Sequence, residues 1–177
     1  MSARITLILG GSRSGKSARA EALARLSERP VTYVATYAAG PADGEMSERI
    51  DAHRARRPAE WQTVENRFDL AVLFGELRGR TVVLDCLTLW LSYHCETVSE
   101  PDLLQRLRAA LEEARRSGLE LYIVSNELGM GLVPSSPEGR AFRDLSGRAN
   151  QLVAALADDV EFQVAGLPLR LKGEHRP

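Results

Sequence analysis

Residues 4–17 read Arg-Ile-Thr-Leu-Ile-Leu-Gly-Gly-Ser-Arg-Ser-Gly-Lys-Ser, an apolar run followed directly by a glycine-rich turn. The run 4–9 is almost continuously apolar, as a strand buried on both faces requires. Residues 10–17 match the pattern G-x-x-x-x-G-K-[ST] in full, and the Ala- and Leu-rich residues 17–27 predict a helix. A strand, this turn and a helix together predict a phosphate-binding loop, or P-loop.

The residue types of this loop fit the binding of a triphosphate. Glycines let backbone N–H groups point into one concavity, and the helix directs its positive end at the same anion. Lys16 is expected to reach the β- and γ-phosphates, and the Ser17 hydroxyl to bind Mg²⁺. Ser12 and Arg13 are expected to line the loop. The alternative is a glycine turn that binds nothing.

Asp85 ends another apolar run, residues 81–85, and could hold Mg²⁺ through water beside Ser17. An aspartate at the end of an apolar strand can also be a turn former or a cap. With the P-loop present, we favour the metal role. The loop and the acid together predict a site for a magnesium nucleoside triphosphate.

The rest of the chain alternates between short apolar runs and helical stretches. Strands are predicted at 31–36, 61–64, 119–124, 160–164 and 167–171, and helices at 46–57, 68–77, 102–116 and 137–157. This alternation predicts an α/β fold with a mostly parallel sheet, helices on both faces and an antiparallel hairpin at the C-terminal edge. Ligands of such folds bind at the carboxyl ends of the strands.

Composition describes an ordinary globular domain and excludes several other classes. The chain has 177 residues, 44% of them hydrophobic, so residues 1–177 are expected to form a single domain. A net charge of -1 gives no general attraction for nucleic acid. No apolar run approaches the roughly 20 residues that span a membrane, and no signal peptide is recognised. The 2 cysteines suggest neither a disulfide framework nor a zinc site, which predicts a cytoplasmic protein.

The predicted helix 46–57 carries Arg49, His53 and Arg57 at helical spacing, so these three side chains share one face. Neighbouring guanidinium charges disfavour imidazolium, which would leave His53 neutral and nucleophilic near pH 7. The same arginines could hold a triphosphate. The alternative is a solvated helix face that bears one ordinary histidine, and this pattern by itself favours that alternative.

Motifs spread in order over nearly the whole chain resemble one family, the bifunctional adenosylcobinamide kinase / adenosylcobinamide-phosphate guanylyltransferases of cobalamin biosynthesis. They are Gly10–Ser17 of the P-loop, Tyr33-Val-Ala-Thr36, Glu45-Met, Arg49-Ile-x-x-His53, Arg57-Pro-x-x-Trp61, Ser125-Asn-Glu-x-Gly-Met-Gly-x-Val-Pro134 and Phe142-Arg-Asp-Leu-x-Gly-Arg-x-Asn-Gln151. The resemblance implies that ATP or GTP phosphorylates the aminopropanol hydroxyl of adenosylcobinamide. GMP from GTP is then joined to adenosylcobinamide phosphate, with His53 carrying the GMP.

The resemblance also implies which residues contact the nucleotide and how the chain assembles. The implied contacts are Gly10, Gly11, Ser12, Arg13, Ser14, Gly15, Lys16, Ser17, Ala35, Thr36, Tyr37, Arg54, Ala55, Arg56, Arg57, Glu65 and Asp85. Lys16 and His53 would be catalytic, and Ser17 and Asp85 would bind the metal. Relatives can carry Glu in place of Asp85, and some carry a second histidine where this chain has Ala52. The family's sheet resembles RecA-like domains, and its members assemble as trimers.

Several other residues have weaker patterns. Glu127 could assist a hydroxyl group or orient water, or it could shape its loop. Arg140, Arg143 and Arg148 are expected on a solvated or subunit-facing surface, and Trp90, Met130 and Cys86 in packing. Two rival functions stay open on the residues alone: a P-loop kinase that forms no covalent adduct, and a non-catalytic RecA-type nucleotide switch.

Overall fold

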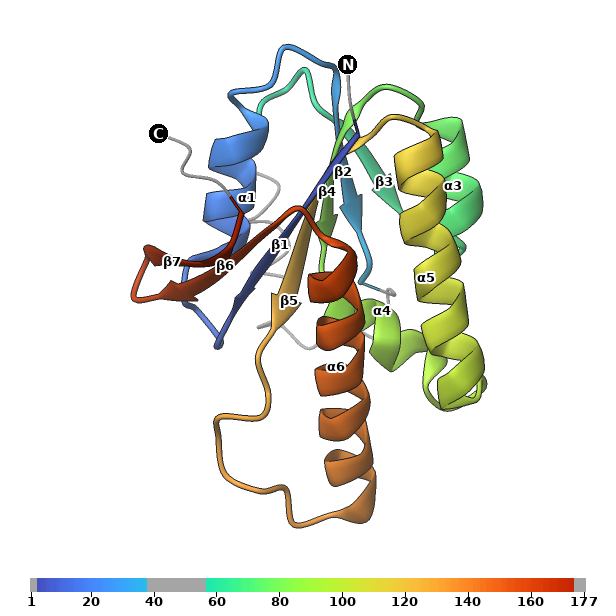
Figure 1. The fold of residues 1–177 in the computed structure, drawn as a ribbon, viewed down its shortest axis with the longest axis vertical. Coiled ribbons are helices and arrows are strands. Elements are labelled where there is room, and N and C mark those ends of the chain that lie inside the picture. The colour runs from blue at the N-terminus through green and yellow to red at the C-terminus, as the bar shows by residue number, and fades with distance from the viewer. Residues whose placement is uncertain (1–2, 38–56, 174–177) are drawn as a thin grey trace.

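The computed structural model describes residues 3–37 and 57–173. These residues form one sheet with the strand order β3-β2-β4-β5-β1-β6-β7 (Figure 1). All neighbouring strands are parallel except β6 and β7, which form an antiparallel hairpin at one edge. The strands are β1 (Arg4–Gly10), β2 (Val31–Ala35), β3 (Gln62–Glu65), β4 (Thr81–Asp85), β5 (Glu120–Asn126), β6 (Asp159–Val164) and β7 (Leu167–Lys172).

Helices cover both faces of the sheet, as Figure 1 shows. In the described residues, α1 packs on one face through Ala20, Leu23 and Ala24, which meet Ile8 and Val83 of the sheet. The other helices build the larger core on the opposite face. The helices are α1 (Lys16–Ala24), α3 (Leu70–Glu76), α4 (Leu87–His94), α5 (Glu100–Arg116) and α6 (Pro137–Leu156).

The helices begin and end where local chemistry requires. Ser99 and Ser136 cap α5 and α6, their hydroxyls accepting hydrogen bonds from Asp102 N and Gly139 N, and a proline follows each cap within two residues. In α5, Leu103, Leu107 and Leu111 are buried along one face, as the leucine spacing predicts. Gly118 follows α5 with a φ of 68°, which only glycine adopts at no steric cost.

The predicted α/β fold, with its mostly parallel sheet and edge hairpin, is confirmed, and the differences are local. α1 ends at Ala24 rather than residue 27, and β5 extends to Asn126 rather than residue 124. The sequence pattern predicts no element where α4 lies. Trp90 and Cys86 are buried as expected, but Met130 is 78% exposed, so its predicted packing role is wrong. The predicted helix 46–57 lies outside the described residues except for Arg57, which lies in a bend.

The register of the parallel strands brings their carboxyl ends to one edge of the sheet, at the bottom of Figure 1. Ala35 pairs with both Glu65 and Asp85, and Gly10 pairs with Asn126 and Gln163. Predicted site residues from four separate parts of the sequence therefore meet at this edge. No helix in the described part of the chain is both long and apolar enough to cross a membrane.

Candidate nucleotide site

The glycine-rich loop joins β1 to α1 at this edge, which confirms the predicted strand, turn and helix. Gly15 caps α1 with a φ of 98°, in the region that L-residues avoid. A Cβ on Gly10 would lie 2.6 Å from the backbone oxygen of Gln163, so β6 can approach the loop only because residue 10 has no side chain. The loop therefore needs glycine at both positions.

Lys16 lies at the first position of α1 and is only 7% exposed. Its Nζ donates a hydrogen bond of 2.5 Å to the carbonyl oxygen of Gly11, so the ammonium group is folded back onto the loop. Burial lowers the pKa of Lys16, and the nearby Cys86 and Asp85 oppose that shift. The ammonium group is thus held beside the loop's backbone, ready to exchange one acceptor oxygen for another.

Asp85 ends β4 and accepts a hydrogen bond from the hydroxyl of Tyr33, a residue in the neighbouring strand β2. Burial, with help from Asp85, raises the pKa of Tyr33, so the phenol stays protonated and keeps its donor. The guanidinium carbon of Arg57 lies 3.6 Å from the centre of the Tyr33 ring, a cation–π contact. Arg57, Tyr33 and Asp85 therefore form a connected chain of side chains that ends near Lys16.

Thr36 joins the ends of β2 and β4. Its backbone N–H donates to Asp85 O at 3.1 Å, and its hydroxyl donates to Cys86 O at 2.6 Å and accepts from Cys86 N at 2.8 Å. Burial raises the pKa of the Cys86 thiol to about 12, so this thiol is protonated at physiological pH. Thr36 and Cys86 thus fix the position of the Asp85 backbone, while a nucleotide contact of Thr36 itself stays a prediction.

The remaining predicted site residues divide into two groups. Ala35 and Glu65 end neighbouring strands in register, and Tyr37 follows them at the same edge. His53, Arg54, Ala55 and Arg56 lie outside the described residues. The nucleotide roles of both groups stay predictions.

A hollow of about 440 Å³ runs beside the P-loop, between the loop, Glu127 and the β6–β7 hairpin. The hairpin is tied to the loop because Gly166 N donates to Ser14 O at 2.9 Å. Gln163, at the floor of this region, is 1% exposed, and neither polar atom of its side chain has a hydrogen-bond partner among the described residues. Sequence reasoning gave no role to Gln163 or to the Tyr33 phenol, since only the pairing of distant strands places them here.

The donor set at the loop fits the predicted Mg²⁺. The described residues contain no cluster of three or more His, Cys, Asp or Glu side chains that could bind a metal by themselves. Mg²⁺ in nucleotide sites uses few protein ligands and takes the rest from phosphate and water. The hydroxyl of Ser17, in the first turn of α1, and the carboxylate of Asp85 supply hard oxygen donors of this kind.

A parallel sheet with a P-loop after its first strand, a buried lysine on the following helix and an acid ending a neighbouring strand define a nucleotide-binding protein of the P-loop class. Solved structures with the same fold include the RadB recombinase, with a TM-score of 0.55 and 17% identity, covering 98% of this chain and 83% of that chain. A KaiC-like protein from Pyrococcus horikoshii has a TM-score of 0.53 and 13% identity, covering 90% of this chain and 70% of that chain. These similarities establish the RecA-like fold and nothing about activity.

Residues 6–171 match the family described as cobinamide kinase / cobinamide phosphate guanyltransferase, and the chain belongs to this family. A bifunctional adenosylcobalamin biosynthesis protein, CobP of Pseudomonas aeruginosa, is 47% identical over 172 residues, 95% of this chain and 97% of that protein. The CobU protein of Salmonella typhimurium, with the same description, is 36% identical over 182 residues, 94% of this chain and 98% of that protein. The chain is therefore an enzyme of the kinase and nucleotidyltransferase class that acts in adenosylcobalamin biosynthesis.

Proposed function

We propose that this protein catalyses two successive reactions at the carboxyl edge of its sheet. It first transfers the γ-phosphoryl group of ATP or GTP to the aminopropanol hydroxyl of adenosylcobinamide. It then joins GMP from GTP to the resulting phosphate, which gives adenosylcobinamide-GDP and releases pyrophosphate. The observation that carries the proposal is the P-loop, with Lys16 and Asp85 at one edge of a chain that matches this family over residues 6–171.

In the kinase step, Lys16 exchanges Gly11 O for the β- and γ-phosphate oxygens, and the backbone N–H groups of the loop and of α1 hold the rest of the triphosphate. The acceptor oxygen attacks the γ-phosphorus, the bond to the β-phosphate oxygen breaks and the hydroxyl proton leaves to a base. Mg²⁺, held by Ser17 and Asp85, would neutralise charge on the phosphates. The Tyr33 hydroxyl keeps the Asp85 carboxylate oriented.

In the guanylyl step, an imidazole nitrogen of His53 attacks the α-phosphorus of GTP and pyrophosphate leaves. An oxygen of adenosylcobinamide phosphate then attacks the same phosphorus, and the phosphorus–nitrogen bond breaks. The contact of Arg57 with Tyr33, and of Tyr33 with Asp85, supports this assignment because residue 57 follows the histidine segment closely in sequence. Arg54, Ala55, Arg56 and Glu65 are proposed as further nucleotide contacts.

Incubation with α-labelled GTP and Mg²⁺ tests the covalent step. The expected result is an acid-labile, base-stable label on the protein that is lost in His53→Ala. The matched control is His94→Ala, since His94 packs against Trp90 at the end of α4 and is assigned no role. Wild-type protein that phosphorylates adenosylcobinamide but never takes up label would instead be a P-loop kinase without a covalent intermediate.

Product analysis with adenosylcobinamide and GTP tests both reactions together. The expected products are adenosylcobinamide phosphate and then adenosylcobinamide-GDP. The rival reading as a non-catalytic RecA-type switch has the fold in its favour, but membership of an enzyme family opposes it. The switch hypothesis would be supported only if wild-type protein bound GTP and formed neither product.

We further propose that the protein works as a homotrimer in the cytoplasm, built from one domain, and that it binds no nucleic acid. The assembly rests on the family resemblance alone. Light scattering after size-exclusion chromatography tests it, with the 19.5 kDa chain expected at three times its own mass.

A further inference from the structure

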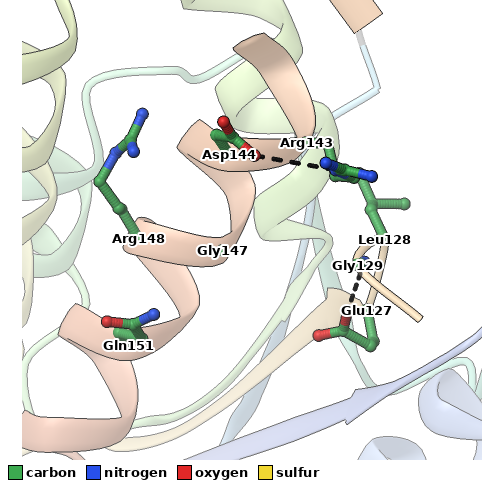
Figure 2. Close-up of a pocket in the computed structure, with 8 residues that line it drawn as sticks. All are labelled: Glu127, Leu128, Gly129, Arg143, Asp144, Gly147, Arg148 and Gln151. Carbon is green, nitrogen blue, oxygen red and sulfur yellow. Dashed lines mark hydrogen bonds and ion pairs between the residues drawn. The ribbon is translucent and has the colours of Figure 1, made fainter. Parts of the chain in front are cut away.

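A second hollow, of about 390 Å³, opens between the segment that follows β5 and the first half of α6 (Figure 2). Its lining residues are Glu127, Leu128, Gly129, Arg143, Asp144, Gly147, Arg148 and Gln151. They come from two sequence motifs, around residues 125–134 and 142–151, that the phosphate loop does not use. The volume falls in the range of about 300–1,000 Å³ that is usual for small-molecule sites.

Glu127 connects this hollow to the P-loop, because it lines both this hollow and the one beside the loop. Its backbone N–H donates to Gly10 O at 3.0 Å, which fixes residue 127 against the start of the loop. Its carboxylate accepts a hydrogen bond from Gly129 N, as Figure 2 shows. A ligand in the second hollow therefore has Glu127 between itself and the triphosphate site.

The charges in the hollow favour a neutral polar ligand over a second triphosphate. Two arginines, Arg143 and Arg148, and two carboxylates, Glu127 and Asp144, line the hollow, so the formal charges balance. Arg148 is already bonded to Glu100, with Nη2 2.8 Å from Oε2. A polyanion placed here would meet about as much repulsion as attraction.

Arg143 is the cation best able to bind something new. Its closest ion-pair distance, from Nε to Asp144 Oδ1, is 3.7 Å, which is longer than a hydrogen bond, and its side chain is 22% exposed. Figure 2 shows this guanidinium on the same side of α6 as Glu127. Arg143 offers donors and Glu127 an acceptor, a pair that suits a ligand with both a carbonyl and a hydroxyl group.

We propose that this hollow receives the hydroxyl-bearing amide arm of the acceptor, with Arg143 bound to the arm and Glu127 bound to its hydroxyl. The inference rests on the proposed function and names the acceptor subsite of that function. When the hydroxyl oxygen forms its bond to the γ-phosphorus and the nucleoside diphosphate leaves, the hydroxyl proton passes to the Glu127 carboxylate. The guanidinium of Arg143 then pairs with the new phosphate monoester.

Steady-state kinetics of Arg143→Gln test the arm contact. The KM for adenosylcobinamide is expected to rise at least tenfold, while the KM for GTP changes less than twofold and α-labelled GTP still labels the protein. Arg143→Lys should restore part of the acceptor affinity. The matched control is Arg108→Gln, an exposed arginine on α5 with the same charge change. An unchanged KM for the acceptor, or an equal rise in both KM values, overturns the proposal.

Equilibrium dialysis with a non-hydrolysable GTP analogue present measures the binding of adenosylcobinamide in the absence of turnover. Binding to wild-type protein that weakens in Arg143→Gln, at an unchanged melting temperature, supports the subsite. Equal binding by both proteins, or no binding by either, overturns it. If wild-type protein binds the corrinoid but forms no product, the proposed function fails while the binding comparison still decides the subsite.

A second variant, Glu127→Gln, tests the proton acceptor. It is expected to lower kcat about 100-fold or more with little change in either KM, and to abolish the acidic limb of the kcat–pH profile. Loss of activity with an unchanged pH profile would instead assign Glu127 to loop structure.

Discussion

The position and the protonation state of Lys16 depend on its hydrogen bond, its burial and a nearby charge. Its hydrogen bond to Gly11 O occupies one donor, burial lowers its pKa, and the Asp85 charge favours the ammonium form. In the proposed kinase step, a triphosphate would replace this neutral carbonyl by a charged acceptor, which forms a stronger bond to the same donor. The loss of the hydrogen bond from Lys16 to Gly11 O would therefore be offset when a nucleotide binds.

Lys16→Met is expected to reduce kcat/KM for the kinase step about 100-fold or more, because a preorganised charged donor to the transferring phosphate is lost. The measurement is the initial rate with adenosylcobinamide. Lys172→Met is the matched control, since Lys172 is exposed and its Nζ donates to the backbone oxygens of Ala154 and Ala155, far in sequence from the P-loop. Equal losses in the two variants would contradict a role for Lys16 in phosphate binding.

The side-chain amide of Gln163 is buried without a hydrogen-bond partner among the described residues, so an apolar side chain of the same size would lower the free-energy cost of burial at this position. Each buried polar group without a partner costs about 1–3 kcal/mol, and Met has nearly the volume of Gln. Gln163→Met is therefore expected to leave the free energy of unfolding unchanged or to raise it by about 1 kcal/mol in urea denaturation. Gln105→Met, on the exposed face of α5, is the control. A loss greater than about 1 kcal/mol would mean that the amide has a structural partner after all.

At the scale of elements, the start of α6 is fastened to the segment that leads into it from β5. Ser136 Oγ accepts from Gly139 N at 3.0 Å, and Arg140 Nη1 donates to Pro134 O at 3.0 Å and to Ser135 O at 2.7 Å. Ser136 thus satisfies one orphan donor of the first turn, and Arg140 satisfies two carbonyls of the incoming loop.

Ser136→Ala removes this cap and is expected to lower the free energy of unfolding by about 1 kcal/mol. Urea denaturation measures it. Ser135→Ala keeps the backbone carbonyl that Arg140 uses and removes only an exposed hydroxyl, so it should change stability by less than about 0.5 kcal/mol. A Ser136 variant as stable as the Ser135 variant would show that water replaces the cap at no cost.

Elements were predictable where burial leaves a periodic or continuous pattern. The strands β1 and β4 are buried on both faces and read as apolar runs, and α5 reads as a helix because only one face is buried. The sequence does not predict α4 because its residues, Leu-Thr-Leu-Trp-Leu-Ser-Tyr-His, include no Asp, Glu, Lys or Arg to mark an exposed face at helical spacing. Its burial depends on Trp90, whose Nε1 donates to Phe68 O at 2.8 Å.

The site was predictable only where its signal is local. The P-loop lies in eight consecutive residues, so its pattern is visible in the sequence. The bond between Tyr33 and Asp85, and the position of Gln163 beneath the loop, depend on pairing between strands far apart in the chain. The direction of Arg143 depends on which face of α6 packs against the sheet, and this depends on the whole core.

At the scale of the whole molecule, two carboxylates, Glu120 and Asp158, connect the elements at the amino-terminal edge of the sheet. Glu120 accepts hydrogen bonds from Ser27 Oγ at 2.8 Å, Thr81 Oγ1 at 3.0 Å and Tyr122 Oη at 2.8 Å, which joins the segment after α1 to β4 and β5. Asp158 accepts from Ile5 N at 2.8 Å and pairs with Arg115 of α5. The sheet is thus fastened at the edge opposite to the nucleotide site.

These carboxylates make stability depend on pH. Burial by itself would raise the pKa of Glu120, but the hydrogen bonds from Ser27, Tyr122 and Thr81 outweigh it and lower the pKa. Burial by itself would also raise the pKa of Asp158, but the hydrogen bonds from Ile5 N and Arg115 outweigh it and lower the pKa. A carboxyl whose pKa is lower in the folded state stabilises the fold above its unfolded pKa, and the contribution disappears as pH falls through the folded pKa.

The free energy of unfolding is therefore expected to fall with decreasing pH below the ordinary glutamate pKa of about 4.3. Glu120→Gln should be less stable than wild type at pH 7, and the difference should shrink as the solution is acidified, because wild-type Glu120 then loses its charge too. Urea denaturation at a series of pH values measures this. Glu96→Gln, an exposed residue after α4, should follow the wild-type curve. A difference between Glu120→Gln and wild type that stays constant with pH would mean that the side chain acts through packing and not through its charge.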